Sequence, residues 1–277
     1  MQQPSVVAFQ GELGAYSHEA CVKAYPSFDV LPCDSFQAAI EAVRSGQAQL
    51  AMLPVENSTY GRVADIHQLL PESGLHIVAE AFVRVRIALL GVPGANVSDV
   101  SQAHSHPVLL GQCRAFLNQH GIKGVVGVDT AGSARAIAEQ ADQSVAALAS
   151  AFAGEIYGLD VLASDIEDSD HNTTRFLVMA AEPSEPVSSE NTMTSFIFRV
   201  KNIPAALYKA LGGFATNGVN MVKLESYMLD GSFTATQFYA EIQGDPRDAN
   251  VKQAMEELGY FIESSSILGV YPAAKQR

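Results

Sequence analysis

The sequence predicts an α/β fold with a largely parallel sheet up to about residue 180, followed by a smaller ferredoxin-like βαββαβ unit. Two observations predict this division. Short apolar runs alternate with helical patterns through residues 5–180, which is typical of strand–helix repeats. A stretch rich in Pro, Ser and Glu then separates these elements from a second set in a different order.

The elements of the first part follow from apolar spacing and from residues that begin or end helices. Ser35 or Asp34 can cap one helix and Gly46 can end it. Residues 76–92 form a long extended segment, which could cross between two lobes. We expect strands over 6–9, 50–55 and 125–128, and helices over 15–25, 36–43, 63–70, 109–117, 131–141 and 149–157.

The second part carries its own signals. Asn202 can cap a helix that has Pro204 in its first turn, and Asp230-Gly231 is a hairpin signal. We expect strands over 193–200, 219–229, 233–242 and from 260, with helices carrying Leu207 to Phe214 and over 247–258. This order is the ferredoxin-like one. The resulting division is a first domain over 1–182, a linker over 183–191, a second domain over 192–272 and a frayed tail over 273–277.

Composition narrows the function classes. Of 277 residues 48% are hydrophobic and 17% charged, and the net charge is −13, which argues against nucleic acid and anionic membranes as partners. No apolar stretch is long enough to span a bilayer. The N-terminus shows no secretory signal, and three cysteines without a C-x-x-C pair fit reduced thiols. We therefore expect a cytoplasmic protein.

The most informative stretch is Asn172-Thr173-Thr174-Arg175-Phe176, which opens an apolar run. A hydroxyl beside an arginine can donate a proton or a hydrogen bond while the guanidinium holds a carboxylate. An anionic substrate would need such a positive group, because the chain as a whole is acidic. The alternative interpretation is a solvated entry to a strand.

Four further polar clusters follow strands or open helices, and each has an ordinary alternative as a turn or a helix cap. His104 and His106 share a strand face, but no third metal ligand lies nearby. Cys113 lies on an apolar helix face, which favours packing over a nucleophilic role. No G-x-S-x-G, H-E-x-x-H or C-x-x-C motif occurs. The clusters are 11–17, 54–61, 105–113 and 129–133.

Together these clusters resemble one family. The order G-x-x-G-A-Y-S, P-V-E-N-S-x-x-G, S-H-P with Q-C, D-T-A and N-x-T-R-F is similar to that of prephenate dehydratase. The second domain, with Ala205-Ala206-Leu207 and Leu224-Glu225-Ser226, resembles the ACT domain that follows it in that family. The resemblance covers nearly the whole chain.

The resemblance implies a fold and a reaction. The fold would be two α/β lobes of the periplasmic-binding-protein kind with the site between them. The reaction removes water and CO₂ from prephenate to give phenylpyruvate, on the way to phenylalanine, without a cofactor or a metal. Thr174 would be the general acid, Glu56 would orient the site, and Arg175 and Phe176 would fix Thr174 and close the pocket floor. The residues of the substrate site would be Ser17, Glu56, Asn57, Ser58, Ser105, Gln112, Thr130, Arg175 and Phe176.

Departures from the family pattern leave alternatives open. Val108 replaces a usual Gln after S-H-P, so arogenate dehydratase remains an alternative. In the ACT motifs Ala205 replaces a Gly and Tyr227-Met228 replaces Arg-Pro, although phenylalanine is the expected effector. A homodimer or homotetramer is implied, and rival interpretations are a solute-binding protein or an amino-acid sensor. The effector residues would be Ala205, Ala206, Leu207, Asn220, Glu225 and Ser226.

Overall fold

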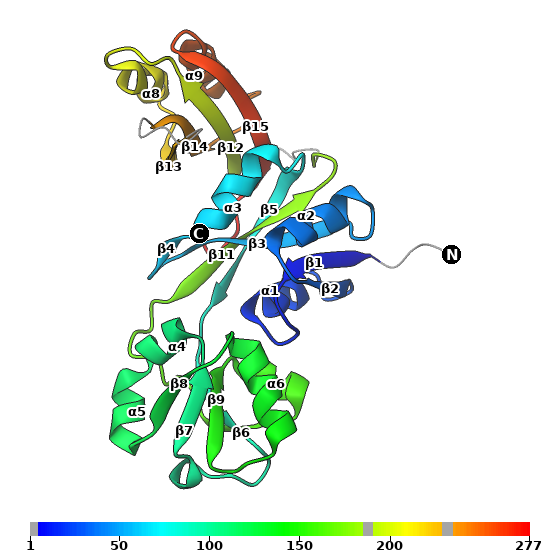
Figure 1. Ribbon diagram of the computed structural model, residues 1–277. Helices are drawn as coiled ribbons and strands as arrows, with labels where there is room; N and C mark the ends of the chain where they lie inside the picture. The colour runs from blue at the N-terminus through cyan, green and yellow to red at the C-terminus, as the bar shows by residue number, and fades with distance from the viewer. Residues whose placement is uncertain (1–4, 185–190, 229–234) are drawn as a thin grey trace. The chain divides into compact units, whose positions relative to one another are not determined.

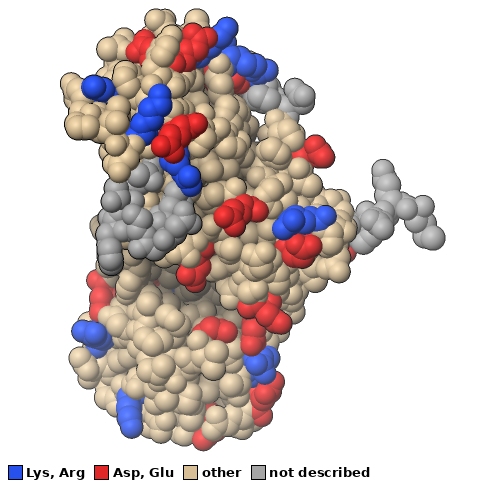
Figure 2. Space-filling view, turned by 45° about the horizontal axis from the view of Figure 1, so that its top comes forward, with Lys and Arg blue, Asp and Glu red and all other residues tan. Residues whose placement is uncertain are grey.

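The computed structural model describes residues 5–184, 191–228 and 235–277 (Figure 1). The chain forms two compact units, one of residues 1–66 and 81–176 and the other of residues 67–80 and 177–277. None of the helices in the described ranges has the length and hydropathy that crossing a membrane requires. Figure 2 shows acidic and basic side chains interspersed over the one face that it draws.

The first lobe is built on a mixed sheet in the order β2-β1-β3-β11-β5, with β4 paired to β3. β1 runs parallel to both β2 and β3, and β4 is antiparallel to β3. The strands are β1 (Val6–Gln10), β2 (Asp29–Cys33), β3 (Leu50–Asn57), β4 (Gly61–Arg62), β5 (His76–Arg84) and β11 (Thr173–Ala180). The helices are α1 (Tyr16–Ala24), α2 (Phe36–Arg44) and α3 (Ala64–Leu69), which the 3₁₀ turn Leu70–Glu72 follows.

The second lobe has its own sheet, in the order β10-β6-β9-β7-β8. β7 is parallel to β8 and β9, whereas β6 is antiparallel to β9 and β10. The strands are β6 (Ala88–Gly91), β7 (Gln102–Ser105), β8 (Lys123–Val126), β9 (Val145–Ala149) and β10 (Asp160–Ala163). Helices α4 (Pro107–Gln112) and α5 (Arg114–His120) cover one face, and α6 (Thr130–Gln140) and α7 (Ala151–Tyr157) the other.

The long extended segment predicted over 76–92 does join the two sheets, but as two strands. β5 belongs to the first sheet and β6 to the second, and residues 85–87 between them leave the ladder. Val85 N–H donates to the carbonyl of Asn172, which precedes β11. Two chain segments therefore meet where the lobes join.

Two predicted helices and the predicted sheet direction differ from those observed. The helix expected from Leu109 to Leu117 breaks at Cys113, because the Asp168 carboxylate accepts hydrogen bonds from the backbone N–H groups of Arg114 and Ala115. The helix expected to begin at Ala149 begins at Ala151, after the unpredicted buried strand β9. The sheets are mixed rather than largely parallel, since β6 pairs antiparallel with both neighbours.

The C-terminal half confirms the ferredoxin-like βαββαβ order. The elements are β12 (Thr192–Val200), α8 (Ala206–Thr216), β13 (Met221–Met228), β14 (Ala235–Gln243), α9 (Ala249–Gly259) and β15 (Ile262–Pro272). The sheet order is β13-β14-β12-β15, and neighbouring strands are antiparallel. Phe196, Phe214 and Leu258 belong to the core between this sheet and its two helices. Most of the predicted linker and the turn at Asp230-Gly231 lie outside the described residues.

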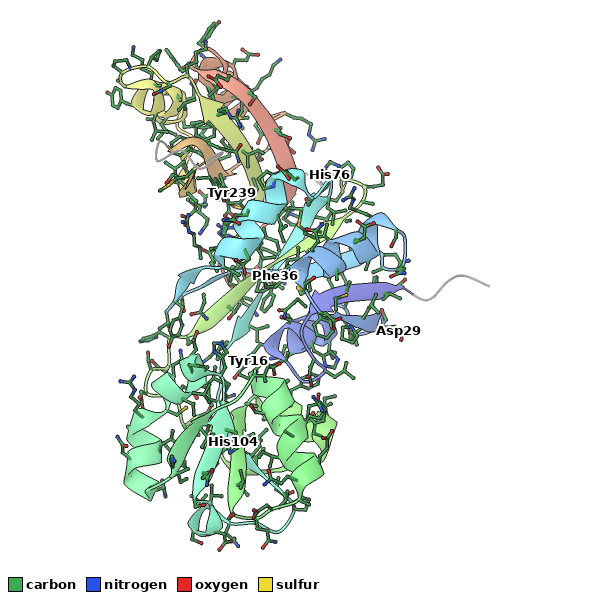
Figure 3. The ribbon with its side chains drawn as sticks, in the orientation of Figure 1. Tyr16, Asp29, Phe36, His76, His104 and Tyr239 are labelled. Atoms are coloured by element: carbon green, nitrogen blue, oxygen red, sulfur yellow. The ribbon has the colours of Figure 1, made fainter. Side chains whose placement is uncertain are left out.

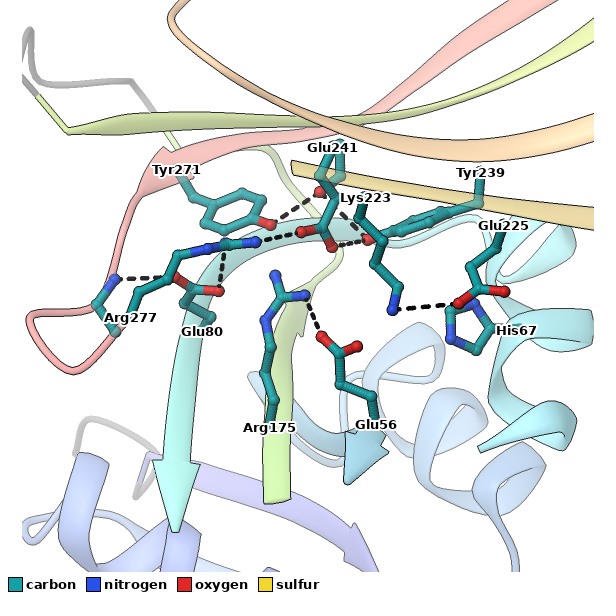
Figure 4. Close-up of polar contacts among 12 residues, drawn as sticks. Glu56, His67, Glu80, Arg175, Lys223, Glu225, Tyr239, Glu241, Tyr271 and Arg277 are labelled. Carbon is teal, nitrogen blue, oxygen red and sulfur yellow. Dashed lines mark hydrogen bonds and ion pairs between the residues drawn. The ribbon is translucent and has the colours of Figure 1, made fainter. Parts of the chain in front are cut away.

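Two predictions about this half are wrong. Asn202 does not cap α8, because the N-cap position is Ala205, which has a left-handed φ of 61° and gives no side-chain cap. The chain end is not frayed (Figure 4). Arg277 Nη1 lies 2.9 Å from Glu80 Oε2, and its Nη2 lies 2.6 Å from Glu241 Oε2. The side chains of Glu80 and Glu241 are fully buried, so Arg277 forms ion pairs with two buried carboxylates.

Candidate active site

Three contacts join the end of β3 to the start of β11. Ser58 N–H donates to the Thr173 carbonyl at 2.9 Å, Asn57 contacts Thr174, and Glu56 pairs with Arg175. The numbers fall on one strand as they rise on the other, so the two strands are antiparallel here. Because side chains alternate between faces, Asn57 and Thr174 share one face of the sheet and the Glu56–Arg175 pair lies on the other.

Thr174 is held by an amide. Asn57 Nδ2 donates to Thr174 Oγ1 at 3.1 Å and to Asn172 Oδ1 at 2.6 Å. The other end of the amide, Asn57 Oδ1, accepts from the backbone N–H groups of Thr59 and Tyr60 at 2.9 and 3.0 Å. Thr174 is partly exposed, and its hydroxyl oxygen is held by the Asn57 amide.

The arginine beside Thr174 is buried and pairs with a carboxylate of the protein. Arg175 is 3% exposed, and its Nη1 lies 2.8 Å from Glu56 Oε1 (Figure 4). Phe176, the next residue of β11, is buried in the hydrophobic core and is 1% exposed. In this structure the guanidinium of Arg175 therefore binds Glu56, and Phe176 packs inside the protein.

Ser58 fastens the same two strands rather than projecting freely. Its hydroxyl donates to the carbonyl of His171 at 2.6 Å and accepts from Thr173 N–H at 2.9 Å. Asn57 likewise uses both amide hydrogens within the protein. The direct contacts of these two residues with a substrate stay a prediction, and their observed contacts fix the position of Thr174.

Ser105, Gln112 and Thr130 all belong to the second lobe. Ser105 ends β7 and is fully buried, with its hydroxyl donating to the Leu148 carbonyl at 2.7 Å. Thr130 is the first residue of α6, whose cap is Asp129. Gln112 ends α4, and its Oε1 is buried without a hydrogen-bond partner among the described residues. An unpaired buried amide oxygen is costly unless it meets a ligand or water.

The glycine cluster before α1 packs against the second lobe. Gly14 has a φ of 86°, and a Cβ there would lie 3.1 Å from the Cα of Ala153 in α7. Ser150, the cap of α7, donates to the Gly14 carbonyl at 3.2 Å. Ser17 is buried in α1. Its neighbour Tyr16, which Figure 3 labels, donates to the Arg86 carbonyl at 2.9 Å. The close approach that Gly14 permits is thus between the two lobes.

The acidic loop before β11, which contains Asp165, Glu167 and Asp168, binds other segments of the chain. The sequence did not predict these contacts. Asp165 accepts two hydrogen bonds from Arg86, Glu167 accepts from Ile87 N–H, and Asp168 caps α5. The Arg86 guanidinium lowers the pKa of the Asp165 carboxyl below its usual range. The partners lie 50 or more residues away, so no local pattern pointed to them. The sequence did contain a signal for Asn172: it lies two positions before Thr174, and residues two apart on a strand point to the same face.

A cavity of about 600 Å³ lies elsewhere in the same unit. Residues of the two lobe-joining segments line it, including Arg84, Arg86 and Asp165, together with Phe152 of α7. None of the predicted site residues is among its described lining residues. The chemistry of the Thr174 cluster, rather than the size of this cavity, identifies the candidate site.

The cysteines and histidines show no nucleophilic or metal-binding arrangement in the described ranges. Burial raises the pKa of the Cys113 thiol to about 12, which keeps it a neutral packing group at pH 7. Cys113 is fully buried, as its place on an apolar helix face predicted. No group of three or more His, Cys, Asp or Glu side chains that could hold a metal ion occurs in the described part of the chain.

The predicted effector residues fall on two faces of the C-terminal sheet. Ala206 and Leu207 lie in α8 and pack against the core that α8 and α9 form. Ser226 pairs with Phe238 of that core, whereas Glu225 pairs with Tyr239 on the opposite face and forms an ion pair with Lys223 at 3.4 Å. Asn220 is exposed and donates to Gln243 Oε1 at 3.0 Å. One copy of the domain therefore does not gather all six residues.

Comparison with known proteins gives consistent matches over the chain. The family model described as prephenate dehydratase matches residues 7–184. A Komagataeibacter europaeus protein described as a bifunctional N-acyl-homoserine lactone acylase/prephenate dehydratase is 49% identical, with 100% of this chain and 99% of that protein covered. Arogenate dehydratase/prephenate dehydratase 1 of Arabidopsis thaliana is 38% identical, over 96% of this chain and 71% of that protein.

Solved structures match equally well. One described as a novel type of quorum-quenching acylase has a TM-score of 0.93 at 49% identity and covers 98% of this chain and 99% of its own. A prephenate dehydratase from Arthrobacter aurescens, solved in complex with L-Phe, has a TM-score of 0.89 at 28% identity and covers 98% of this chain and 91% of its own.

Proposed function

This chain belongs to the prephenate dehydratase family, and we propose that it converts prephenate to phenylpyruvate with Thr174 as the general acid. The observation that carries the proposal is the hydrogen bond from Asn57 Nδ2 to Thr174 Oγ1, beside the buried Arg175–Glu56 pair. Because Thr174 Oγ1 already accepts a hydrogen bond, its own hydrogen remains available for donation to a substrate.

The reaction needs one proton and a positioned dianion. The bond from the ring carboxylate carbon breaks, and its electron pair enters the ring as the C4–oxygen bond breaks. Thr174 transfers its hydroxyl hydrogen to the departing oxygen, so water and CO₂ leave and an aromatic ring remains. Thr174 then regains a proton from solvent. Aromatisation supplies the driving force, and the protein supplies orientation and the proton.

A threonine hydroxyl is a weak acid, so its surroundings must favour loss of the proton. The Asn57 amide donates to Oγ1 and would stabilise the negative charge that grows there. We assign to Glu56 the task of holding Arg175, whose backbone neighbours Thr174, and to Gln112 a substrate contact through its unpaired oxygen. Ser17, Ser105 and Thr130 complete the proposed site.

Incubation with prephenate at neutral pH tests the proposal, with phenylpyruvate detected by its enolate absorbance in alkali. A parallel incubation with arogenate decides between prephenate and arogenate, since the names of the relatives include dehydratases of both. Val108, which differs from the family pattern, packs partly buried against the core of the second lobe. Absence of turnover of both compounds would refute the proposal.

A second activity is a candidate because of one relative. The Komagataeibacter europaeus protein, 49% identical over the whole chain, is described as an N-acyl-homoserine lactone acylase as well as a prephenate dehydratase. Release of homoserine lactone from an N-acyl-homoserine lactone tests this activity directly. The Thr174→Ala variant shows whether the same hydroxyl serves both reactions.

We also propose that the C-terminal domain is an ACT domain that binds phenylalanine and inhibits turnover. A related prephenate dehydratase was solved with L-Phe, and the βαββαβ unit here has the expected order. Because the six effector residues lie on two faces, pairing of two copies would bring a complete site together, in a homodimer or homotetramer. Titrating turnover with phenylalanine, beside sedimentation with and without it, tests this. A flat titration would refute the inhibition.

A further inference from the structure

Asn172 is a buried residue that has no role in the reaction steps proposed above. It is 3% exposed and lies two residues before Thr174. Its Oδ1 accepts a hydrogen bond from Asn57 Nδ2 at 2.6 Å, and the same nitrogen donates to Thr174 Oγ1 at 3.1 Å. The amide of Asn57 thus bridges Asn172 and Thr174.

The orientation of the bridging amide is determined by its other end. Asn57 Oδ1 accepts from two backbone N–H groups, those of Thr59 and Tyr60. A flipped amide would place its NH₂ against these two donors, so the nitrogen must face Asn172 and Thr174. With two donated and two accepted hydrogen bonds, Asn57 has used its full capacity. Of its four observed partners, Thr174 is the one that links it to the proposed reaction.

This arrangement fixes the direction of the threonine proton. A hydroxyl has one hydrogen and two lone pairs, and one lone pair of Thr174 Oγ1 receives the Asn57 hydrogen. The hydroxyl hydrogen must then point away from the amide. Without Asn172, the Asn57 NH₂ group would lose the shorter of its two hydrogen bonds, so the hydrogen that it donates to Thr174 would be held less closely.

We propose that Asn172 is a positioning residue, which holds the Asn57 amide so that it polarises Thr174 and directs its proton. The inference rests on the proposed function of Thr174. Asn172 is itself anchored, because its carbonyl accepts from Val85 N–H, between β5 and β6. The position of the donor therefore depends on the segment that joins the two lobes.

The test compares Asn172→Ala and Asn172→Asp, alone and in an Asn57→Ala background, in the full chain. Asn172→Ala should lower kcat on prephenate by about tenfold or more and change KM by less than about threefold. Asn172→Asp keeps an oxygen for Asn57 and should recover most of kcat. In the Asn57→Ala background Asn172→Ala should cause no further loss, because both residues act through one amide.

Several results would overturn the positioning role. They are a folded Asn172→Ala variant with unchanged kcat, additive losses in the double variant, or an Asn172→Asp variant as slow as Asn57→Ala. The last comparison decides the matter even if Asn172→Ala does not fold. The ¹⁵N-resolved side-chain amide protons of Asn57 give a readout independent of turnover: they should lose protection from exchange in Asn172→Ala and keep it in Asn172→Asp. Unchanged protection in both variants refutes the role, whatever the wild-type chain does with prephenate.

Discussion

Arg175 and Glu56 face each other across β11 and β3, with Nη1 2.8 Å from Oε1 and the arginine side chain 4% exposed. Removing one partner of a buried ion pair leaves the other charge in a poor environment. The partly exposed carboxylate moderates this effect, so Glu56→Ala should lower the free energy of unfolding by about 2 kcal/mol. Urea denaturation measures this.

The matched control is Glu41→Ala, because Glu41 forms a surface pair with Arg44 at 3.5 Å. An exposed pair contributes about 0.5 kcal/mol or less. Equal losses from the two variants would show that the buried pair has no special weight.

Ala205 has a left-handed backbone with a φ of 61°, at the position where the family pattern has glycine. A non-glycine residue in this conformation costs about 1 kcal/mol, so Ala205→Gly should stabilise the protein by up to about that amount. Ala206→Gly, one residue later in α8, should instead destabilise it by about 1 kcal/mol. Denaturation midpoints that move in the same direction for both variants would contradict this account.

Arg277 binds the buried carboxylates of Glu80 and Glu241. Arg277→Gln should lower the free energy of unfolding by about 3 kcal/mol, because two buried acids lose their guanidinium. Lys23→Gln, which removes a cation with a 63% exposed side chain, serves as the control and should change stability by less than about 0.5 kcal/mol. An Arg277 variant as stable as the control would show that these ion pairs contribute nothing measurable to stability.

His18 makes the stability depend on pH. Burial lowers the pKa of His18 in the folded state, where its Nδ1 accepts a hydrogen bond from Gly14 N–H at 2.9 Å. The unfolded chain therefore binds more protons, and the stabilisation is present above about pH 6.5 and is lost as the pH falls through the lowered pKa. His18→Gln should reduce the loss of unfolding free energy between pH 7.5 and pH 5.

His120 is exposed, so His120→Gln is the matched histidine-to-glutamine control for this pH series. A pH dependence that persists in full in His18→Gln would assign it to other groups.

Local signals predicted the elements well where the cause is local. Ser35 does cap α2, accepting from Ala38 N–H at 3.1 Å, and the βαββαβ order followed from spacing alone. The strand β9 was missed, because its sequence Val-Ala-Ala-Leu-Ala has no period that separates a buried strand from a helix. The break at Cys113 depends on Asp168, a partner distant in sequence.

The candidate site was predictable as a set of residues but not as a geometry. Thr174 and Arg175 stood out by their chemistry, and strand alternation placed Thr173 on the opposite face from Thr174. The pairing of Asn57 with both Asn172 and Thr174 depends on the register of β3 against β11, which joins positions more than 100 residues apart. No single-sequence pattern encodes that register.

The most direct measurement is the turnover of prephenate by Thr174→Ala beside Thr173→Ala. The two threonines are neighbours on β11, and only Thr174 shares a face with Asn57. The account predicts that Thr174→Ala lowers kcat by at least about 100-fold while the fold survives, and that Thr173→Ala stays within about threefold of the wild type. Near-normal turnover by the Thr174 variant, or an equal loss in both, would contradict it.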